Sequence, residues 1–380
     1  MPKSLKIIIT VIILALIVWI VAEKGERAPS ASGTLDIGVI SALTGTVAYI
    51  GESTMRGAEI GKIKVEADYP NLTINLHHED SMFVPKTGID AYNKLRTSNN
   101  INALITMASN VSVAVEPLAI QDNILHIAAS TLANGFTTPN DLTFRVTSKV
   151  ETGVSKVVEY LELKNLNKLA VIYMTNEIGV SLRDGLRKSL ADSQTQIVHE
   201  EGFAPDLNDF RTLLLKVKGS GADSLYLASL ASHTSTLLKQ AKELGLNVKY
   251  ISYQAAEDPV LIKNAGDLAE AVVYVSAYDV NSGDSLNSEF TSLYREKYGE
   301  DPNGYAAEAY EATRLVAETY VKCGSTLEST ENIQCAKDFL FNIKNRPSLF
   351  GPLSFDSNGD VTYPFFLKTV RDGKFVRYEE

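Results

Sequence analysis

Five consecutive segments decide the fold: LTINLHHED at 72–80, TGIDAYNKLRTSN at 87–99, INALITMA at 101–108, VSVAVEPLAIQDN at 111–123 and ILHIAAS at 124–130. The first alternates apolar and polar residues with the period of a strand, and the third and fifth are short apolar runs that indicate buried strands. The segments between them have the spacing of amphipathic helices. With a strand at 35–43 and a helix at 53–68, the order is βαβαβαβ, which predicts a parallel doubly wound sheet with helices on both faces.

A second series of the same kind follows. It contains helices at 154–165, 179–193, 209–221 and 234–246, and strands at 168–175, 195–203, 223–229, 248–253 and 269–278. Helices return at 288–299 and 306–323, before strand-like pieces in 351–378. The pattern predicts an α/β protein with two similar doubly wound, Rossmann-like units.

Composition excludes several classes of protein. The chain has 380 residues, of which 45% are hydrophobic and 22% charged, as in an ordinary globular protein and unlike a disordered or collagen-like one. Its length allows two domains. The net charge of −10 argues against a nucleic-acid partner, because binding to a phosphate backbone needs clustered positive charge.

The N-terminus carries an apolar run, IIITVIILALIVWIVA at 7–22, after Lys3 and Lys6. The run is slightly short for a bilayer core and slightly long for a secretory signal, and Ile20 stands where a cleavage site needs a small residue. We therefore expect residues 1–33 to hold an uncleaved signal anchor and a linker, with a cleaved signal as the alternative. No cysteine directly follows the run, which excludes a lipoprotein. The basic residues on its N-terminal side predict that residues 34–380 lie outside the cytoplasm.

No motif for catalysis or for a cofactor is present. The sequence lacks GxSxG, a phosphate-binding GxxxxGK[ST] loop, GxGxxG after a strand, and HExxH. His77 and His78 precede two acids, but neighbouring side chains on a strand point to opposite faces and do not chelate one ion. We expect no catalytic residue, no metal site and no cofactor.

The two cysteines, Cys323 and Cys335, lie in VKCGSTLESTENIQCAKDFL, where a polar turn separates two helix-like segments. An exported protein favours a disulfide between them, which would close a short loop and contribute about 2 to 3 kcal/mol. The alternative is a pair of free thiols.

Several motifs together resemble one family. They are SALTGTVAYIG at 41–51 with RGAE at 56–59, Glu79-Asp80 with Pro85-Lys86, IAAST at 127–131, LLKQAKELG at 237–245, PNGYAAEAY at 302–310 and GPLSFDSNGD at 351–360. Their order along residues 34–375 resembles the leucine/isoleucine/valine-binding proteins of ABC transporters. The resemblance implies a type I periplasmic-binding-protein fold, in which two lobes hold the ligand between them. It also implies three crossovers, near 147–152, 275–279 and 352–355. Lobe I would then comprise 34–149 and 279–353, and lobe II 150–278 and 354–380.

The first lobe offers hydroxyl groups where strands end. Ser109 and Asn110 follow one strand, and Ser130 and Thr131 end the next. Ligands of open α/β sheets bind outside the carboxyl ends of the strands, so these residues predict an anion cradle. The alternative is ordinary helix capping. The resemblance assigns the ligand carboxylate to Ser109, Ser130 and Thr131. It assigns an aromatic wall to Tyr49 and Ile50, to which Tyr305 adds.

The facing lobe departs from the family. Alignment puts Ile178 and Leu230 where amino-acid-binding members have tyrosines for the α-ammonium, and Gln254 where they have a glutamate. A buried ammonium without a counter-charge or acceptors is costly. Glu257 lies three residues further on and supplies the acid if the loop shifts. We expect a ligand that is a carboxylate or an amide in preference to a zwitterion.

The leading hypothesis is an extracytoplasmic solute-binding receptor, not an enzyme, that binds an amino acid, amide or carboxylate and presents it to an ABC permease. The alternative is a membrane-tethered ligand sensor of the same fold that signals to a partner. An enzyme on a flavodoxin-like scaffold is the third possibility, and no residue pattern supports it.

Overall fold

The computed structural model describes residues 33–379, and its first sheet contains five parallel strands in the order β2-β1-β3-β4-β5. We call this sheet and the helices packed on it the first lobe. Its strands are β1 (Gly33–Ser41), β2 (Leu72–Asp80), β3 (Ala103–Met107), β4 (Leu125–Ser130) and β5 (Thr143–Arg145). The early helices are α2 (Ala48–Asp68), α3 (Pro85–Lys94) with a π-helical end η1 (Leu95–Asn99), and α4 (Ser109–Gln121).

The second sheet has seven strands in the order β14-β13-β10-β9-β8-β6-β7, and with its helices it forms the second lobe. Its strands are β6 (Lys168–Met174), β7 (Gln196–Phe203), β8 (Ser224–Ala228), β9 (Lys249–Ser252), β10 (Val272–Ser276), β13 (Phe366–Arg371) and β14 (Lys374–Arg377). Its helical segments are α5 (Val150–Leu163), α6 (Glu177–Ser189), α7 (Arg211–Ser220), α8 (Ala231–Glu243), η2 (Gln254–Ala256), α9 (Pro259–Ala265) and η3 (Gly266–Ala271).

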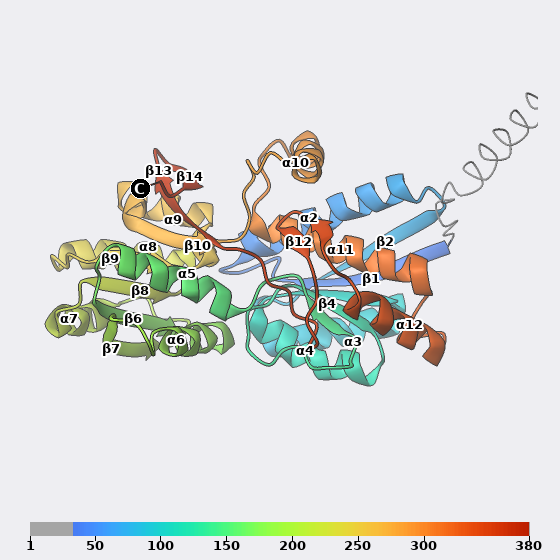
Figure 1. Cartoon of the computed structure of the whole chain (residues 1–380), viewed down its shortest axis with the longest axis horizontal. Helices are drawn as coiled ribbons and strands as arrows, with labels where there is room; N and C mark the ends of the chain where they lie inside the picture. Colours follow the sequence, from blue (N-terminus) through green and yellow to red (C-terminus); the bar gives the residue numbers. More distant parts are fainter. Residues whose placement is uncertain (1–32, 380) are drawn as a thin grey trace, which may run out of the picture.

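The chain then returns to the first lobe with α10 (Ser285–Tyr298), α11 (Gly304–Cys323), α12 (Thr330–Phe341) and a small pair of strands, β11 (Arg346–Ser348) and β12 (Gly351–Leu353). Helix α11 packs against α2 and β4. Figure 1 shows the two lobes at opposite ends of the long axis, with α10, α11 and α12 beside the elements of the first lobe. The first lobe is therefore built from two parts of the sequence.

The two lobes repeat one strand order. The first lobe has the order β2-β1-β3-β4-β5, and the second contains the order β7-β6-β8-β9-β10. In each lobe the first strand lies next to the outer strand that follows it in sequence, and the third strand pairs with the other side of the first. This confirms the predicted α/β class with two doubly wound lobes. The C-terminal strands differ from the parallel pattern, because β13 pairs antiparallel with β10, and β14 pairs antiparallel with β13.

Three connections join the lobes: one between β5 and α5, one after β10, and one before β13. The third lies beyond the crossing expected at 352–355, since Phe355, Val361 and Tyr363 pack in the apolar core of the first lobe. Ion pairs join the end of β5 and the first connection to the loop that precedes the third connection. Arg145 meets Asp360 at 2.6 Å, and Lys149 meets Asp356 at 2.7 Å and Asp360 at 2.8 Å.

Two further features bear on the sequence predictions. Helix α2 begins at Ala48 instead of residue 53, so Tyr49 and Ile50 are helical and not part of a loop. A disulfide joins Cys323, the last residue of α11, to Cys335 in α12. No helix among residues 33–379 is long and apolar enough to cross a membrane, and the apolar run at 7–22 lies outside the described residues.

Candidate ligand-binding site between the lobes

A cavity of about 50 Å³ lies between the lobes, several times the roughly 10 to 15 Å³ that one water molecule needs. Nearly all of its lining side chains are buried, and apolar residues of both lobes belong to one continuous cluster around it. The two lobes therefore pack against each other around the cavity. Its lining consists of Val47, Ile50, Phe83, Met107, Ala108, Ser109, Ser130, Leu132, Ile178, Leu230, Tyr253, Gln254, Ala255 and Tyr305.

Equivalent positions of the two sheets supply most of this lining. In the first lobe, most lining residues end or follow β1, β3 and β4, while Phe83 follows β2 and Tyr305 lies in α11. In the second lobe, the lining residues follow β6, β8 and β9. These strands flank the point where each sheet changes direction, which is where doubly wound sheets bind ligands beyond their carboxyl ends. Two such binding edges thus face each other across one cavity.

One isoleucine from each lobe occupies the same place in this arrangement. Ile50 precedes Gly51 in α2, and Ile178 precedes Gly179 in α6. A Cβ on Gly51 would lie 1.9 Å from the carbonyl oxygen of Ala42, and one on Gly179 would lie 2.0 Å from that of Met174. Only glycine allows each helix to start so close to the preceding strand, and this closeness holds both isoleucines at the cavity wall.

Ser109 is placed to donate a hydrogen bond to a ligand. It is the first residue of α4, and its Oγ accepts the backbone N–H of Leu132 at 3.1 Å and of Ala133 at 3.2 Å. Because a hydroxyl oxygen has two acceptor sites, these bonds leave Ser109 only its O–H to offer. No acceptor for this O–H is present among residues 33–379, so the geometry favours a ligand oxygen.

Phe83 enters the cavity from a strained turn. Met82 and Phe83 both have left-handed backbone angles, with φ of 52° and 62°, which are costly for residues with a side chain. The Asp80 carboxylate accepts the N–H of Met82 at 2.8 Å and of Leu43 at 2.9 Å, and Asn110 Nδ2 donates to the Phe83 carbonyl at 2.7 Å. Asn110 therefore supports Phe83 and does not itself line the cavity.

The second lobe presents an apolar face with one amide. Ile178, Leu230, Tyr253 and Ala255 supply carbon and aromatic surface, and Gln254 is the amide. None of the lining residues in the described chain is a lysine, arginine, histidine, aspartate or glutamate. The cavity thus has no charged side chain in direct contact with a ligand.

Seven of the eleven residues expected in the site line this cavity; listed in order, they are Ile50, Ser109, Ser130, Ile178, Leu230, Gln254 and Tyr305. Tyr49 lies outside it, and burial raises its pKa to about 12 against the lowering effect of a hydrogen bond with Asn303. Thr131 is fully buried and donates to Ser112 Oγ at 2.6 Å, so its hydroxyl is used inside the first lobe.

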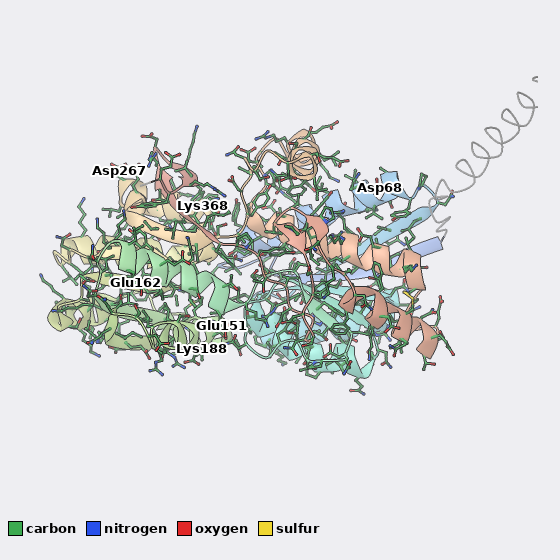
Figure 2. The ribbon with its side chains drawn as sticks, viewed as in Figure 1. Asp68, Glu151, Glu162, Lys188, Asp267 and Lys368 are labelled. Atoms are coloured by element: carbon green, nitrogen blue, oxygen red, sulfur yellow. A yellow bond between two sulfur atoms is a disulfide. The ribbon has the colours of Figure 1, made fainter. Side chains whose placement is uncertain are left out.

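Glu257 does not supply an acid to the main cavity. Its carboxylate pairs with Lys368 of β13, which Figure 2 labels in the second lobe. Glu257 lines a smaller neighbouring cavity of about 10 Å³ instead. A lysine therefore already neutralises this acid.

Sequence reasoning missed Glu308, which lies in the wall of that smaller cavity. The Ser130 hydroxyl donates to its Oε2 at 2.5 Å, and Gln254 Nε2 donates to its Oε1 at 3.4 Å, so it joins polar groups of both lobes. Burial raises its pKa to about 8. Glu308 is three residues after Tyr305, and this helical spacing was the available signal that the two share a face.

Among residues 33–379, no three His, Cys, Asp or Glu side chains gather where they could hold a metal ion. His77 instead meets Asp36 at 2.8 Å, and His78 meets Glu59 at 3.5 Å.

Known proteins resemble the chain over most of its length. A family model described as periplasmic binding protein matches residues 34–374. Leu/Ile/Val-binding protein homolog 3 of Brucella melitensis is 22% identical over 359 residues, covering 93% of this chain and 95% of that protein.

Solved structures share the fold. A leucine binding protein LivK from Thermotoga maritima superposes with a TM-score of 0.84 at 18% identity, over 91% of this chain and 98% of that one. An ABC-transporter solute-binding protein from R. palustris, in complex with benzoate, has a TM-score of 0.81 at 20% identity, over 91% and 95% of the two chains.

Proposed function

The chain belongs to the periplasmic binding protein family, and from that premise we propose that it is the receptor of an ABC uptake system for a small carboxylate that lacks an α-ammonium group. The family places it outside the cytoplasm and makes it a solute-binding protein. The proposal concerns the ligand, the membrane anchor and the permease.

The observation that carries the proposal is the contrast between the two faces of the cavity. On the first lobe, Ser109 has its acceptor sites filled and its O–H free, which suits a carboxylate oxygen. On the second lobe, Ile178 and Leu230 are apolar and Gln254 is neutral. An ammonium there would lose its hydration without gaining a counter-charge in contact with it.

An apolar body with one carboxylate fits this contrast, and both aliphatic and aromatic acids have that form. Phe83, Tyr253 and Tyr305 offer ring surface for an aromatic acid. The R. palustris protein that shares this fold was solved with benzoate, which supports the same ligand class here.

A thermal-shift and calorimetric screen tests the ligand class. The panel is leucine, its des-amino analogue 4-methylpentanoate, benzoate and the neutral isostere benzamide. A ligand at 100 times its Kd stabilises a protein by about 2.7 kcal/mol, which shifts the melting temperature measurably. We expect 4-methylpentanoate or benzoate to bind more tightly than leucine. Leucine binding more tightly than every other compound would refute the proposal.

Gln254→Glu provides the matched variant for this screen. The new carboxylate would face the ligand from the second lobe, repel a carboxylate and attract an ammonium. We expect benzoate affinity to fall and leucine affinity to rise relative to the wild type. Equal losses for both ligands would indicate damage to the site instead of a change in its charge.

We also propose that residues 7–22 anchor the protein in the membrane and that an ABC permease receives the ligand. Lys3 and Lys6 before the run, and the polar linker after it, support an uncleaved anchor. Mass spectrometry of the protein from its native membranes tests this, since a cleaved signal would remove the run. Co-purification with a permease tests the partner.

A further inference from the structure

Glu308 is a buried acid without a cationic partner. It lies in α11 with a relative exposure of 4%, beside Ser130 of the first lobe and Gln254 of the second. Two other buried carboxylates of the described chain have arginine partners: Glu311 meets Arg346 at 2.9 Å, and Asp360 meets Arg145 at 2.6 Å. Buried Asp258 has no such partner among residues 33–379, and it accepts the backbone N–H of Val260. Burial of Glu308 without such a partner favours its neutral form and raises its pKa to about 8.

The proton on Glu308 decides what Ser130 can offer to a ligand. An ionised carboxylate only accepts hydrogen bonds, so Ser130 must turn its single O–H toward Glu308 and present lone pairs to the cavity. A protonated carboxyl can donate to Ser130 Oγ instead, which frees the serine O–H for a ligand oxygen. The 2.5 Å contact allows both directions of donation, and Ser130 lines the cavity.

We propose that Glu308 makes the cavity selective for an anion, because its protonated carboxyl lets Ser130 join Ser109 as a second hydrogen-bond donor to the ligand carboxylate. When Glu308 is ionised, the Ser130 O–H is engaged by Glu308 and is lost as a donor to the ligand. The negative charge of Glu308 then also repels the ligand carboxylate. Binding of an anion above the pKa of Glu308 therefore takes up one proton. This inference rests on the proposed function and identifies the residue that makes the site prefer a negatively charged ligand.

Histidine, acid and tyrosine side chains also lie around Glu308. His126 on β4 stays neutral because burial lowers its pKa to about 3. Glu257 is paired with Lys368. Burial raises the pKa of Asp258 against the lowering effect of the backbone N–H of Val260. The surrounding tyrosines have pKa values raised by burial; they are Tyr49, Tyr253, Tyr274, Tyr278, Tyr305 and Tyr363.

Calorimetry with benzoate at pH 6 to 9, in buffers of different ionisation enthalpy, measures the proton directly. We expect almost no proton uptake at pH 6 and nearly one proton at pH 9, with affinity about tenfold lower at pH 9 than at pH 7. Benzamide carries no charge and should show a much weaker pH dependence.

Two variants identify the responsible acid. Glu308→Gln keeps a donor to Ser130 without a proton to lose, so benzoate binding should become independent of pH and remain tight at pH 9. Glu257→Gln removes another nearby acid and should retain the proton uptake. Uptake that persists in Glu308→Gln, or leucine binding with proton release in the wild type, would overturn the inference.

Thermal unfolding without ligand tests the titration of Glu308 independently of which ligand the protein binds. The pKa of Glu308 rises from 4.5 to about 8 on folding, so its favourable contribution is complete below about pH 4.5 and is lost as the pH rises toward 8. The wild type should therefore lose melting temperature relative to Glu308→Gln between pH 5 and 9. Parallel curves would overturn the inference. Failure of benzoate to bind, with diverging curves, would count against the proposed ligand only.

Discussion

Hydrogen-bond capacity at single residues determines the chemistry of this cavity. Ser109 was predicted from its place at a strand end, and the structure adds that the N–H groups of Leu132 and Ala133 fill its acceptor sites. Thr131, predicted on the same grounds, turns inward to Ser112. The sequence could place both hydroxyls at one edge of the sheet, but it could not tell which one faces the ligand, because that depends on the loop after β4.

Ser109→Ala should weaken benzoate binding by roughly ten- to a hundredfold, since a hydrogen bond to a charged group contributes about 1.5 to 3 kcal/mol. Calorimetry at pH 6 measures the loss. Thr131→Val removes a hydroxyl that lies outside the cavity and should change affinity by no more than about twofold. An equal loss in the two variants would contradict the assigned role of Ser109.

At the scale of elements, close contact between helix and strand shapes the site. The early start of α2 could not be predicted, because Val47 provides no side-chain cap and Gly45 and Thr46 resemble a loop. The contact of Gly51 with Ala42 fixes that start instead. The periodic strands and helices were predictable, whereas β5 has only three residues and relies on its neighbours.

Gly51→Ala should lower the free energy of unfolding by roughly 2 to 3 kcal/mol, because its Cβ would lie 1.9 Å from the Ala42 carbonyl oxygen. Chemical denaturation measures the change, and benzoate affinity should fall as well because Ile50 moves. Gly219→Ala in α7 is the matched control. Its Cβ would meet nothing within 4 Å, so the substitution should stabilise the protein by up to about 1 kcal/mol.

The disulfide joins two helices of the first lobe and should act on stability alone. A double substitution to serine, Cys323→Ser with Cys335→Ser, should lower the free energy of unfolding by about 2 to 3 kcal/mol for a loop of this length. Benzoate affinity should stay the same, because neither cysteine lines the cavity. Two alkylatable thiols in protein from its native membranes would show that the bond does not form there.

At the scale of the whole molecule, we expect the lobes to separate when a ligand enters the cavity, because most of its lining side chains are buried. The three connections are the segments that such a motion would bend, and Lys149 in the first is paired with Asp356 and Asp360, which precede the third. The family resemblance read from six short motifs is confirmed by the family model over residues 34–374. The position of the third connection was less predictable, because Phe355, Val361 and Tyr363 lie in an irregular segment. Their spacing has neither the helix nor the strand period that would mark them as core residues.

Dyes on the two lobes should report this motion. Asp68 and Asp267 are exposed and lie on different lobes in Figure 2, and both native cysteines are paired, so Asp68→Cys with Asp267→Cys accepts a dye pair selectively. Benzoate should shift single-molecule energy transfer toward one narrow, closed population. A pair at Asp68→Cys and Glu331→Cys, both in the first lobe, should not respond. An unchanged distribution in the first pair would contradict ligand-driven closure.

The packing of α11 on α2 and β4 also has a consequence for biosynthesis. The ribosome completes β1 to β4 long before it reaches residues 304–323, and β6 to β10 of the second lobe emerge in between. Until then, the apolar positions of α2 and β4 that α11 covers remain exposed to solvent. The first lobe therefore cannot complete its core until most of the second lobe has been synthesised, and the second sheet in turn waits for β13 and β14.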